Sequence, residues 1–139
     1  MIKLPVDLPP DLTPLLQALQ RNGVEVRFAP PPRVGAYGLY ESGPRRLWVA
    51  PITDPLGILR QTFIHETVHA VQACPKGQIS LLGVNTIVSP VVAQSIQVLL
   101  YTSYSHGATP VEKEAFEIQG RADAVPLLLK QFKKRCPKG

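Results

Sequence analysis

The sequence is poor in charged and aromatic residues for its length of 139 residues, and it lacks any visible internal repeat. Charged side chains make up 18% of the chain and aromatic ones 6%, whereas hydrophobic residues reach 45%. This balance excludes an intrinsically disordered chain, because the apolar fraction is large enough to form a core. The length fits one domain, residues 1–139, that can bury a core without a covalent staple.

Residues 77–111 lack Asp, Glu, Lys and Arg altogether, so a membrane-spanning segment has to be considered. Polar and helix-breaking residues interrupt this stretch at Gln78, Gly83, Asn85, Pro90, Gln94 and Gln97. No uninterrupted apolar run of bilayer length remains, and a buried helix accounts better for the stretch. Residues 1–12 also lack the apolar segment of a secretory signal. We therefore expect a cytoplasmic protein without a membrane span.

The chain has a formal net charge of +5 but lacks aromatic residues interleaved with its arginines. Much of the positive charge lies toward the end of the sequence, at Lys130, Lys133, Lys134, Arg135 and Lys138. Cations at the end of a helix interact favourably with the helix dipole, whereas a nucleic-acid surface would need stacking residues among them. We interpret the basic cluster as a solvated helix end and expect no nucleic-acid partner. The oligomeric state is left open.

Cysteine is also scarce, with Cys74 and Cys136 as its two examples. Each precedes a proline and ends an expected helix. Two cysteines without C-x-x-C spacing cannot form a zinc knuckle, but they could pair if the two helices lie side by side. Because no secretory signal is recognised, we expect reduced thiols.

The hydrophobic pattern predicts an α+β fold with a small three-stranded sheet that includes a β-hairpin. Strands are expected at 24–28, 36–41 and 45–50. Helices are expected at 13–22, 55–74, 90–104 and 109–134. Asp54 is the expected N-cap of the second helix, and Pro126 is expected to bend the last one. The second helix is apolar almost all round and is therefore central, with the hairpin and two to three further helices packed on it.

This central helix contains the string His65-Glu66-Thr67-Val68-His69. Positions i and i+4 of a helix lie on one face, so His65 and His69 can present two imidazole nitrogens to one metal ion. Glu66 projects nearby, where it can polarise a water. Burying these side chains would cost several kcal/mol unless they are paired, and a metal ion is the simplest partner. A buried helix with two hydrogen-bonded histidines is the structural alternative.

The string matches the H-E-x-x-H signature, and the chain resembles a small zincin metallopeptidase. The metzincin branch is excluded, because Gln72 and Pro75 stand where its extended motif has glycine and histidine, and Met1 is the only methionine. The gluzincin-like branch takes a glutamate from a later helix as the third ligand. The Glu-x-Glu-Ala-aromatic pattern of residues 112–116 is similar to the corresponding segment of small gluzincin-like domains.

Helix geometry favours Glu114 as the third ligand. Glu112 lies three residues after Thr109, which is the capping-box spacing, and is therefore assigned a local role. Glu114 falls at the edge of an apolar stripe, whereas Glu112 and Glu117 are expected to point outward. A carboxylate aimed at the core needs a cation, which zinc would supply. Glu112, Glu117, His106 and Asp123 stay open as candidates for the third ligand.

The resemblance implies a Zn2+ ion held by His65, His69 and Glu114, with a fourth position for water and Glu66 as general base. It also implies a peptide or protein substrate that pairs with a sheet edge formed by residues 46–50. Candidates for stabilising the oxyanion are Tyr101, Tyr104 and His106. The alternative function is a catalytically weak or inactive zinc-binding module that acts as a regulator or interaction domain. A purely structural helical domain is the third possibility.

One position departs from the gluzincin pattern. Families with a Glu-x-x-x-Asp pattern have an acid four residues after the ligand, where this chain has Ile118. The group that orients a zinc-bound histidine is therefore expected to be Asp123 or a backbone carbonyl, and the choice between them stays open.

Overall fold

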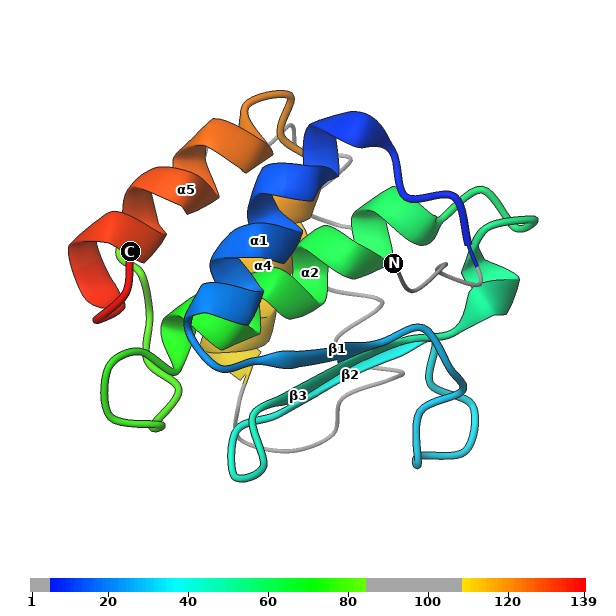
Figure 1. Cartoon of the computed structure of the whole chain (residues 1–139), viewed down its shortest axis with the longest axis horizontal. Helices are drawn as coiled ribbons and strands as arrows, with labels where there is room; N and C mark the ends of the chain where they lie inside the picture. The colour runs from blue at the N-terminus through cyan, green and yellow to red at the C-terminus, as the bar shows by residue number, and fades with distance from the viewer. Residues whose placement is uncertain (1–5, 85–108) are drawn as a thin grey trace.

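A computed structural model of the chain describes residues 6–84 and 109–139. It confirms an α+β fold with a three-stranded sheet. The strands are β1 (Glu25–Arg27), β2 (Gly38–Glu41) and β3 (Arg46–Val49). The α-helices of the described residues are α1 (Thr13–Arg21), α2 (Leu59–Gln72), α4 (Thr109–Gln119) and α5 (Ala124–Arg135) (Figure 1). The helix expected at 90–104 lies outside the described residues, as do Tyr101, Tyr104 and His106.

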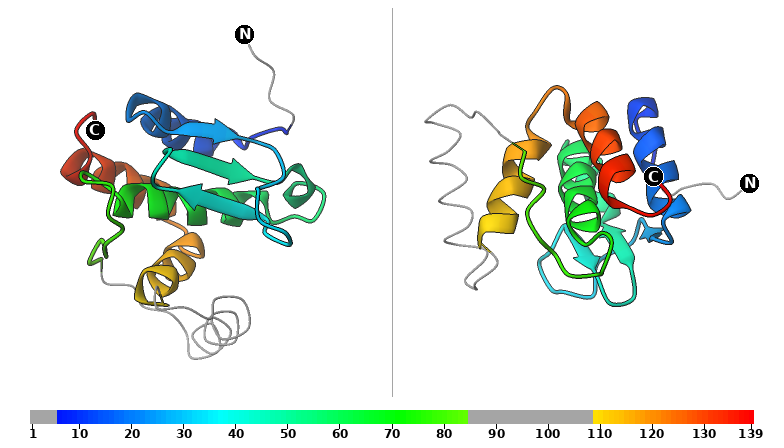
Figure 2. Two further views of the ribbon diagram at one scale, coloured as in Figure 1. Left: turned by 90° about the horizontal axis from the view of Figure 1, so that it is seen from below. Right: turned by 90° about the vertical axis from the view of Figure 1, so that its left-hand side faces the viewer.

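Helix α2 is the centre of the molecule. Every residue from Phe63 to Gln72 is buried, because α2 packs against helices on two sides and against the sheet. Figure 2 shows α1 and α5 on one side of α2, α4 on the other, and the sheet across a third face. Among the helices of the described residues, none has the length and apolarity that crossing a bilayer requires.

The strand order of the sheet is β1-β3-β2. Strands β2 and β3 form the expected antiparallel hairpin, with Leu39 opposite Trp48, and β1 adds in parallel on the far side of β3. The expectation that residues 46–50 form a sheet edge is therefore wrong. Leu47 in β3 is fully buried, which suits an interior strand, and β2 is the edge strand that lies against α2.

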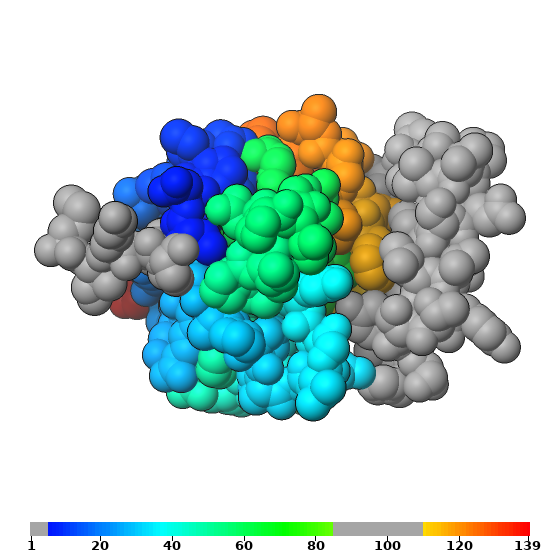
Figure 3. Space-filling view, turned by 90° about the vertical axis from the view of Figure 1, so that its right-hand side faces the viewer, coloured from blue at the N-terminus to red at the C-terminus, as the bar shows by residue number. Residues whose placement is uncertain are grey.

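Helix α2 begins at Leu59, four residues later than expected, and Asp54 does not cap it. A 3-10 helix (Pro51–Thr53) comes first, and the backbone N–H of Ile58 then donates to the Thr53 carbonyl at 2.9 Å. Gly57 has a φ of 75°, a left-handed conformation that stops one continuous helix from running through this turn. Figure 3 shows the segment that leads into α2 in green at the surface, whereas Leu59, the first residue of α2, is already buried in the core.

The single helix expected from 109 to 134 is two helices in the structure. Helix α4 ends at Gln119, and α5 starts at Ala124 after a turn in which the Arg121 N–H donates to the Ile118 carbonyl at 3.0 Å. Pro126 then falls in the first turn of α5, where a backbone N–H has no helical acceptor to lose. The helix is therefore interrupted between Gln119 and Ala124, and is not merely bent at Pro126 as expected.

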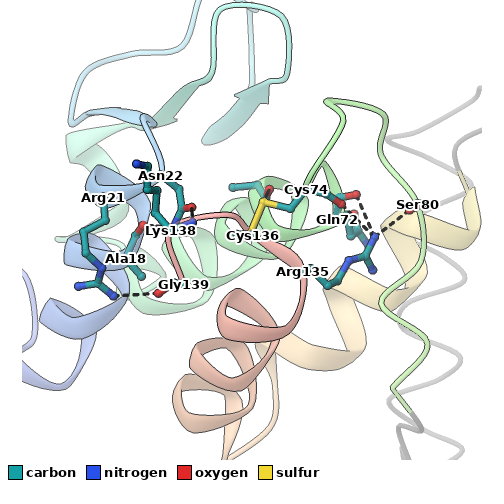
Figure 4. The surroundings of a disulfide bond; sticks show 11 residues. Ala18, Arg21, Asn22, Gln72, Cys74, Ser80, Arg135, Cys136, Lys138 and Gly139 are labelled. Carbon is teal, nitrogen blue, oxygen red and sulfur yellow. Dashed lines mark hydrogen bonds between the residues drawn. A yellow bond between two sulfur atoms is a disulfide. The ribbon is translucent and has the colours of Figure 1, made fainter.

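A disulfide joins Cys74, just after α2, to Cys136, just after α5, so the expectation of reduced thiols is wrong (Figure 4). The two helix ends lie side by side, with a Cα–Cα distance of 5.0 Å. Beside the disulfide, the Arg135 guanidinium donates to the Leu81 carbonyl and to the Ser80 hydroxyl, both at 2.8 Å. These contacts hold the chain that follows α2 against the end of α5.

Candidate metal centre

The side chains of His65, His69 and Glu112 come together between α2 and α4. The two histidines lie one helical turn apart, and their Nε2 atoms are 3.3 Å from each other. The Glu112 carboxylate contacts the His69 Nε2 and lies 3.8 Å from the His65 Nε2. All three residues are buried, and each offers one ligand atom within 4.8 Å of the others. The trio could therefore hold a metal ion.

The hydrogen bonds on the far side of each imidazole define its tautomer. The Nδ1 of His69 lies 2.8 Å from the Gln72 Oε1, and the Nδ1 of His65 lies 2.8 Å from the Gln119 Oε1. An amide oxygen can only accept, so each Nδ1 must donate its proton. In the neutral ring, each Nε2 then has a lone pair that points toward Glu112, which is the arrangement of a metal-ligating histidine.

Two imidazole lone pairs and a carboxylate cannot converge in a buried place without a cation between them. In the metal-free protein a proton on His69, which contacts Glu112, can supply this positive charge. Burial is the largest influence on Glu112 and opposes its charge, but hydrogen bonds from His65 and His69 outweigh burial and lower the Glu112 pKa to about 2. Burial likewise opposes the charge on His69, yet the hydrogen bond to Glu112 raises the His69 pKa above its usual value.

Glu66 stands next to this trio but is not part of it. Its side chain is buried beneath β2, and that burial raises the pKa of its carboxyl group. The β2 backbone passes so close that a Cβ atom on Gly38 would lie 3.0 Å from the Glu66 Oε2. The Glu66 carboxylate therefore occupies the space that a side chain at position 38 would need.

The structure corrects the choice of the third acidic residue: Glu112, not Glu114, lies with the two histidines. Glu114 does point inward, as expected, but other partners satisfy its charge. Its carboxylate accepts hydrogen bonds from the backbone N–H groups of Leu82 (2.7 Å) and Gly83 (3.1 Å) and from the Gln72 Nε2 (2.9 Å). Glu112 is buried rather than outward-facing, so the capping-box argument assigned it the wrong role.

The remaining candidate ligands lie away from the trio or outside the described residues. Glu117 lies 3.9 Å from Lys113, and Asp123 accepts from the Arg121 Nε at 2.7 Å. Asp123 therefore does not orient a histidine, and neither does a backbone carbonyl, because Gln72 and Gln119 hold the two Nδ1 atoms. His106 falls in the undescribed segment.

Sequence reasoning missed both glutamines as partners of the imidazoles. The available signal was spacing: Gln72 follows His69 by three residues, and Gln119 follows Glu112 by seven, which places each pair on one helix face. Counted from Glu112, the position four residues on is Phe116, whose ring packs on His65 with the ring centroids 4.5 Å apart. An aromatic contact thus stands where the gluzincin pattern would have an acid.

A scan of protein-family models, a search of curated proteins and a search of solved structures found no match to this chain. Fold and site together therefore define the protein only as an α+β domain with a buried His-His-Glu centre that could hold a metal ion.

Proposed function

We propose that this protein is a zinc-dependent metallopeptidase. The observation that carries the proposal is the convergence of the His65 and His69 Nε2 atoms with the Glu112 carboxylate, while both Nδ1 atoms are engaged elsewhere. Two imidazoles and one carboxylate are a donor set that suits zinc and leaves a coordination position open for chemistry. The sequence string H-E-x-x-H at residues 65–69 supports the same assignment.

Glu66 supplies the acid–base group of the proposed reaction. A zinc ion held by the trio would lower the pKa of a nearby water and polarise the scissile carbonyl. The Glu66 carboxylate accepts the proton of that water and then delivers it to the leaving amine. Burial raises the pKa of Glu66, which favours the first step because it makes the carboxylate a stronger base toward the proton of the water.

The position of β2 supports an extended peptide as the substrate. Within the described sheet, β2 has a strand neighbour on one side only, and it lies against α2 beside Glu66. An extended peptide segment can pair with such an edge through main-chain hydrogen bonds. Pairing there would bring a peptide bond near Glu66 without demanding a particular side chain.

Burial favours a second candidate, a zinc-binding module with little or no catalysis. His65, Glu66, His69 and Glu112 are each no more than 9% exposed, so the described residues leave little room at the centre for a substrate. In this case zinc would be held for structure or regulation. The two candidates share the metal site and differ in turnover.

The test combines metal content with hydrolysis of an unfolded protein such as casein. We expect one zinc ion per chain and slow hydrolysis. Glu66→Gln should abolish hydrolysis while zinc is retained, because Glu66 is not in the ligand trio. Glu117→Gln, the same change on α4 away from the trio, should leave both unchanged. Zinc without turnover would assign the module, and a wild-type protein that binds no metal would refute both candidates.

A further inference from the structure

We propose that Glu114 is a positioning residue that fixes the tautomer of His69 through the Gln72 side chain. The inference rests on the proposed function, because it concerns a ligand of the same metal centre. Glu114 touches neither histidine in the described structure; it acts on the amide that holds the His69 ring. One chain of hydrogen bonds runs from the Leu82 backbone through Glu114 and Gln72 to the His69 imidazole.

The first link fixes the Glu114 carboxylate. Its Oε1 accepts from the Leu82 N–H at 2.7 Å and its Oε2 from the Gly83 N–H at 3.1 Å. The chain before Leu82 is itself anchored. The Ser80 N–H donates to the Gln72 carbonyl at 3.0 Å, and Arg135 donates to the Ser80 hydroxyl (Figure 4) and to the Leu81 carbonyl. Both carboxylate oxygens are therefore held in place from outside the centre.

The second link is the direction of the Gln72 amide. Gln72 is fully buried, and its Nε2 donates to Glu114 at 2.9 Å and to the Val111 carbonyl at 3.2 Å. A flipped amide would place its oxygen against the Glu114 carboxylate and the Val111 carbonyl. Because a carboxylate can only accept, that orientation would leave a buried charge facing another acceptor. Glu114 thus holds the amide with its oxygen toward His69.

The third link sets the ring. The Gln72 Oε1 lies 2.8 Å from the His69 Nδ1 and requires a proton there, which leaves the Nε2 lone pair free for a metal. With the amide flipped, its NH2 group would face Nδ1, the ring proton would move to Nε2, and the neutral ring could no longer ligate through that atom. A single negative charge outside the trio therefore decides whether His69 can be a ligand.

The first experiment measures zinc affinity by competition with a chelator in the wild type and in Glu114→Gln. The substituted amide can present its NH2 group to Gln72, so the Gln72 amide is free to flip. We expect affinity to fall about 10- to 100-fold, the range for lost outer partners of metal ligands. The matched control, Glu117→Gln, should bind zinc as the wild type does. A Glu114→Gln affinity equal to that of the control would overturn the proposal.

A second variant separates positioning from folding. In Glu114→Gln with Gln72→Glu, the new carboxylate at 72 can only accept, so it fixes the His69 proton on Nδ1 without help from position 114. We expect affinity to recover in part, because the Val111 carbonyl still loses its donor. No recovery in a folded double variant would count against the tautomer mechanism.

The ring proton can also be located directly by 15N NMR of the metal-free protein, at a pH above the His69 pKa. The measurement uses a Glu112→Gln background, because the Glu112 carboxylate would otherwise compete for a proton on Nε2. With Glu114 in place we expect His69 to carry its proton on Nδ1, and with Glu114→Gln on Nε2. A ring protonated on Nε2 in the presence of Glu114, or a tautomer unchanged by Glu114→Gln, would overturn the proposal even if affinity fell. This readout needs no metal, so it separates a failure of this inference from a failure of the proposed zinc site.

Discussion

Two buried glutamates on α4, Glu112 and Glu114, differ in role because their partners differ. Two residues along a helix correspond to a rotation of about 200°, so the two carboxylates leave α4 in different directions. Glu112 meets two imidazoles and needs a cation, whereas Glu114 meets N–H groups and needs none. Burial alone does not make a carboxylate a metal ligand. The groups around it must also be electron-pair donors, such as imidazole nitrogens, and not N–H groups that already satisfy its charge.

Glycine at position 38 is required by the close approach of β2 to α2. A Cβ atom there would lie 2.7 Å from the Thr62 Cγ2 and 2.9 Å from the Glu66 Cγ. We predict that Gly38→Ala lowers the free energy of unfolding by about 1–3 kcal/mol, as over-packing does. Urea unfolding at equilibrium measures the change.

Two further variants make the Gly38 prediction specific. Gly120→Ala adds the same methyl group where, apart from its chain neighbours, no described residue places an atom within 4 Å, and it should change stability by less than about 0.5 kcal/mol. In a Thr62→Ser background, which removes the Cγ2 atom, Gly38→Ala should cost less than in the wild type. An equal cost in both backgrounds would show that the contact with Thr62 is not the cause.

At the scale of residues, the sequence correctly predicted those neighbours that the helical repeat alone brings together. His65 and His69 share a face because they are four apart on one helix. The choice between Glu112 and Glu114 failed because it assumed that α4 buries a single stripe. Helix α4 is covered both by α2 and by the chain at Leu82 and Gly83, so it buries two faces, and only tertiary packing shows which face meets the histidines.

At the scale of elements, local signals predicted α1 and the β2–β3 hairpin, because turns and helix starts depend on a few neighbouring residues. Non-local pairing was not predictable in this way. The position of β3 between β1 and β2 depends on a parallel pairing with residues 25–27, and the Glu25 carboxylate accepts from the Arg46 Nε at 2.9 Å across that pairing. To predict the break before α5, one would have had to know that the chain leaves the helix in a turn at Gly120.

The disulfide is the element-scale feature with the largest expected energy. It closes a loop with a sequence separation of 62 residues and joins the ends of α2 and α5. We predict that reduction, or the double variant Cys74→Ser with Cys136→Ser, lowers the free energy of unfolding by about 2–4 kcal/mol. Urea unfolding with and without a reducing agent measures the difference.

The same double variant is the control, because a reducing agent should leave its stability unchanged. If the oxidised and reduced wild type unfold alike, the disulfide does not contribute. Disulfides are uncommon in proteins of reducing compartments. The cytoplasmic location expected from the sequence stays a prediction.

At the scale of the whole molecule, the centre connects α2 to α4 through His69 and Glu112, which are 112 − 69 = 43 residues apart in the sequence. A cation that bridges them binds the folded chain and not the unfolded one, so it stabilises the fold by mass action. At a free zinc concentration 100 times the dissociation constant, this gain is about 2.7 kcal/mol. A proton can replace the metal only over a limited range of pH.

The metal-free and zinc-loaded proteins should therefore differ in how stability depends on pH. The His69 pKa is raised above 6.5, so its contribution is complete below 6.5 and is lost as pH rises through the folded value. The Glu112 pKa is lowered from 4.5 to about 2, so its contribution is present above 4.5 and is lost as pH falls toward 2. We predict that the metal-free protein is most stable between about pH 4.5 and 6.5, and that its free energy of unfolding falls on both sides of this range.

Zinc should reverse the alkaline part of this profile, because the metal needs unprotonated imidazoles and binds better as pH rises through the raised pKa of His69. Thermal unfolding in a chelator and in excess zinc, compared across pH, measures both profiles. Glu112→Gln, which removes the charge that both cations share, should flatten the metal-free profile near 6.5 and reduce the gain from zinc. Parallel profiles with and without zinc would mean that the metal does not take the place of the proton between α2 and α4.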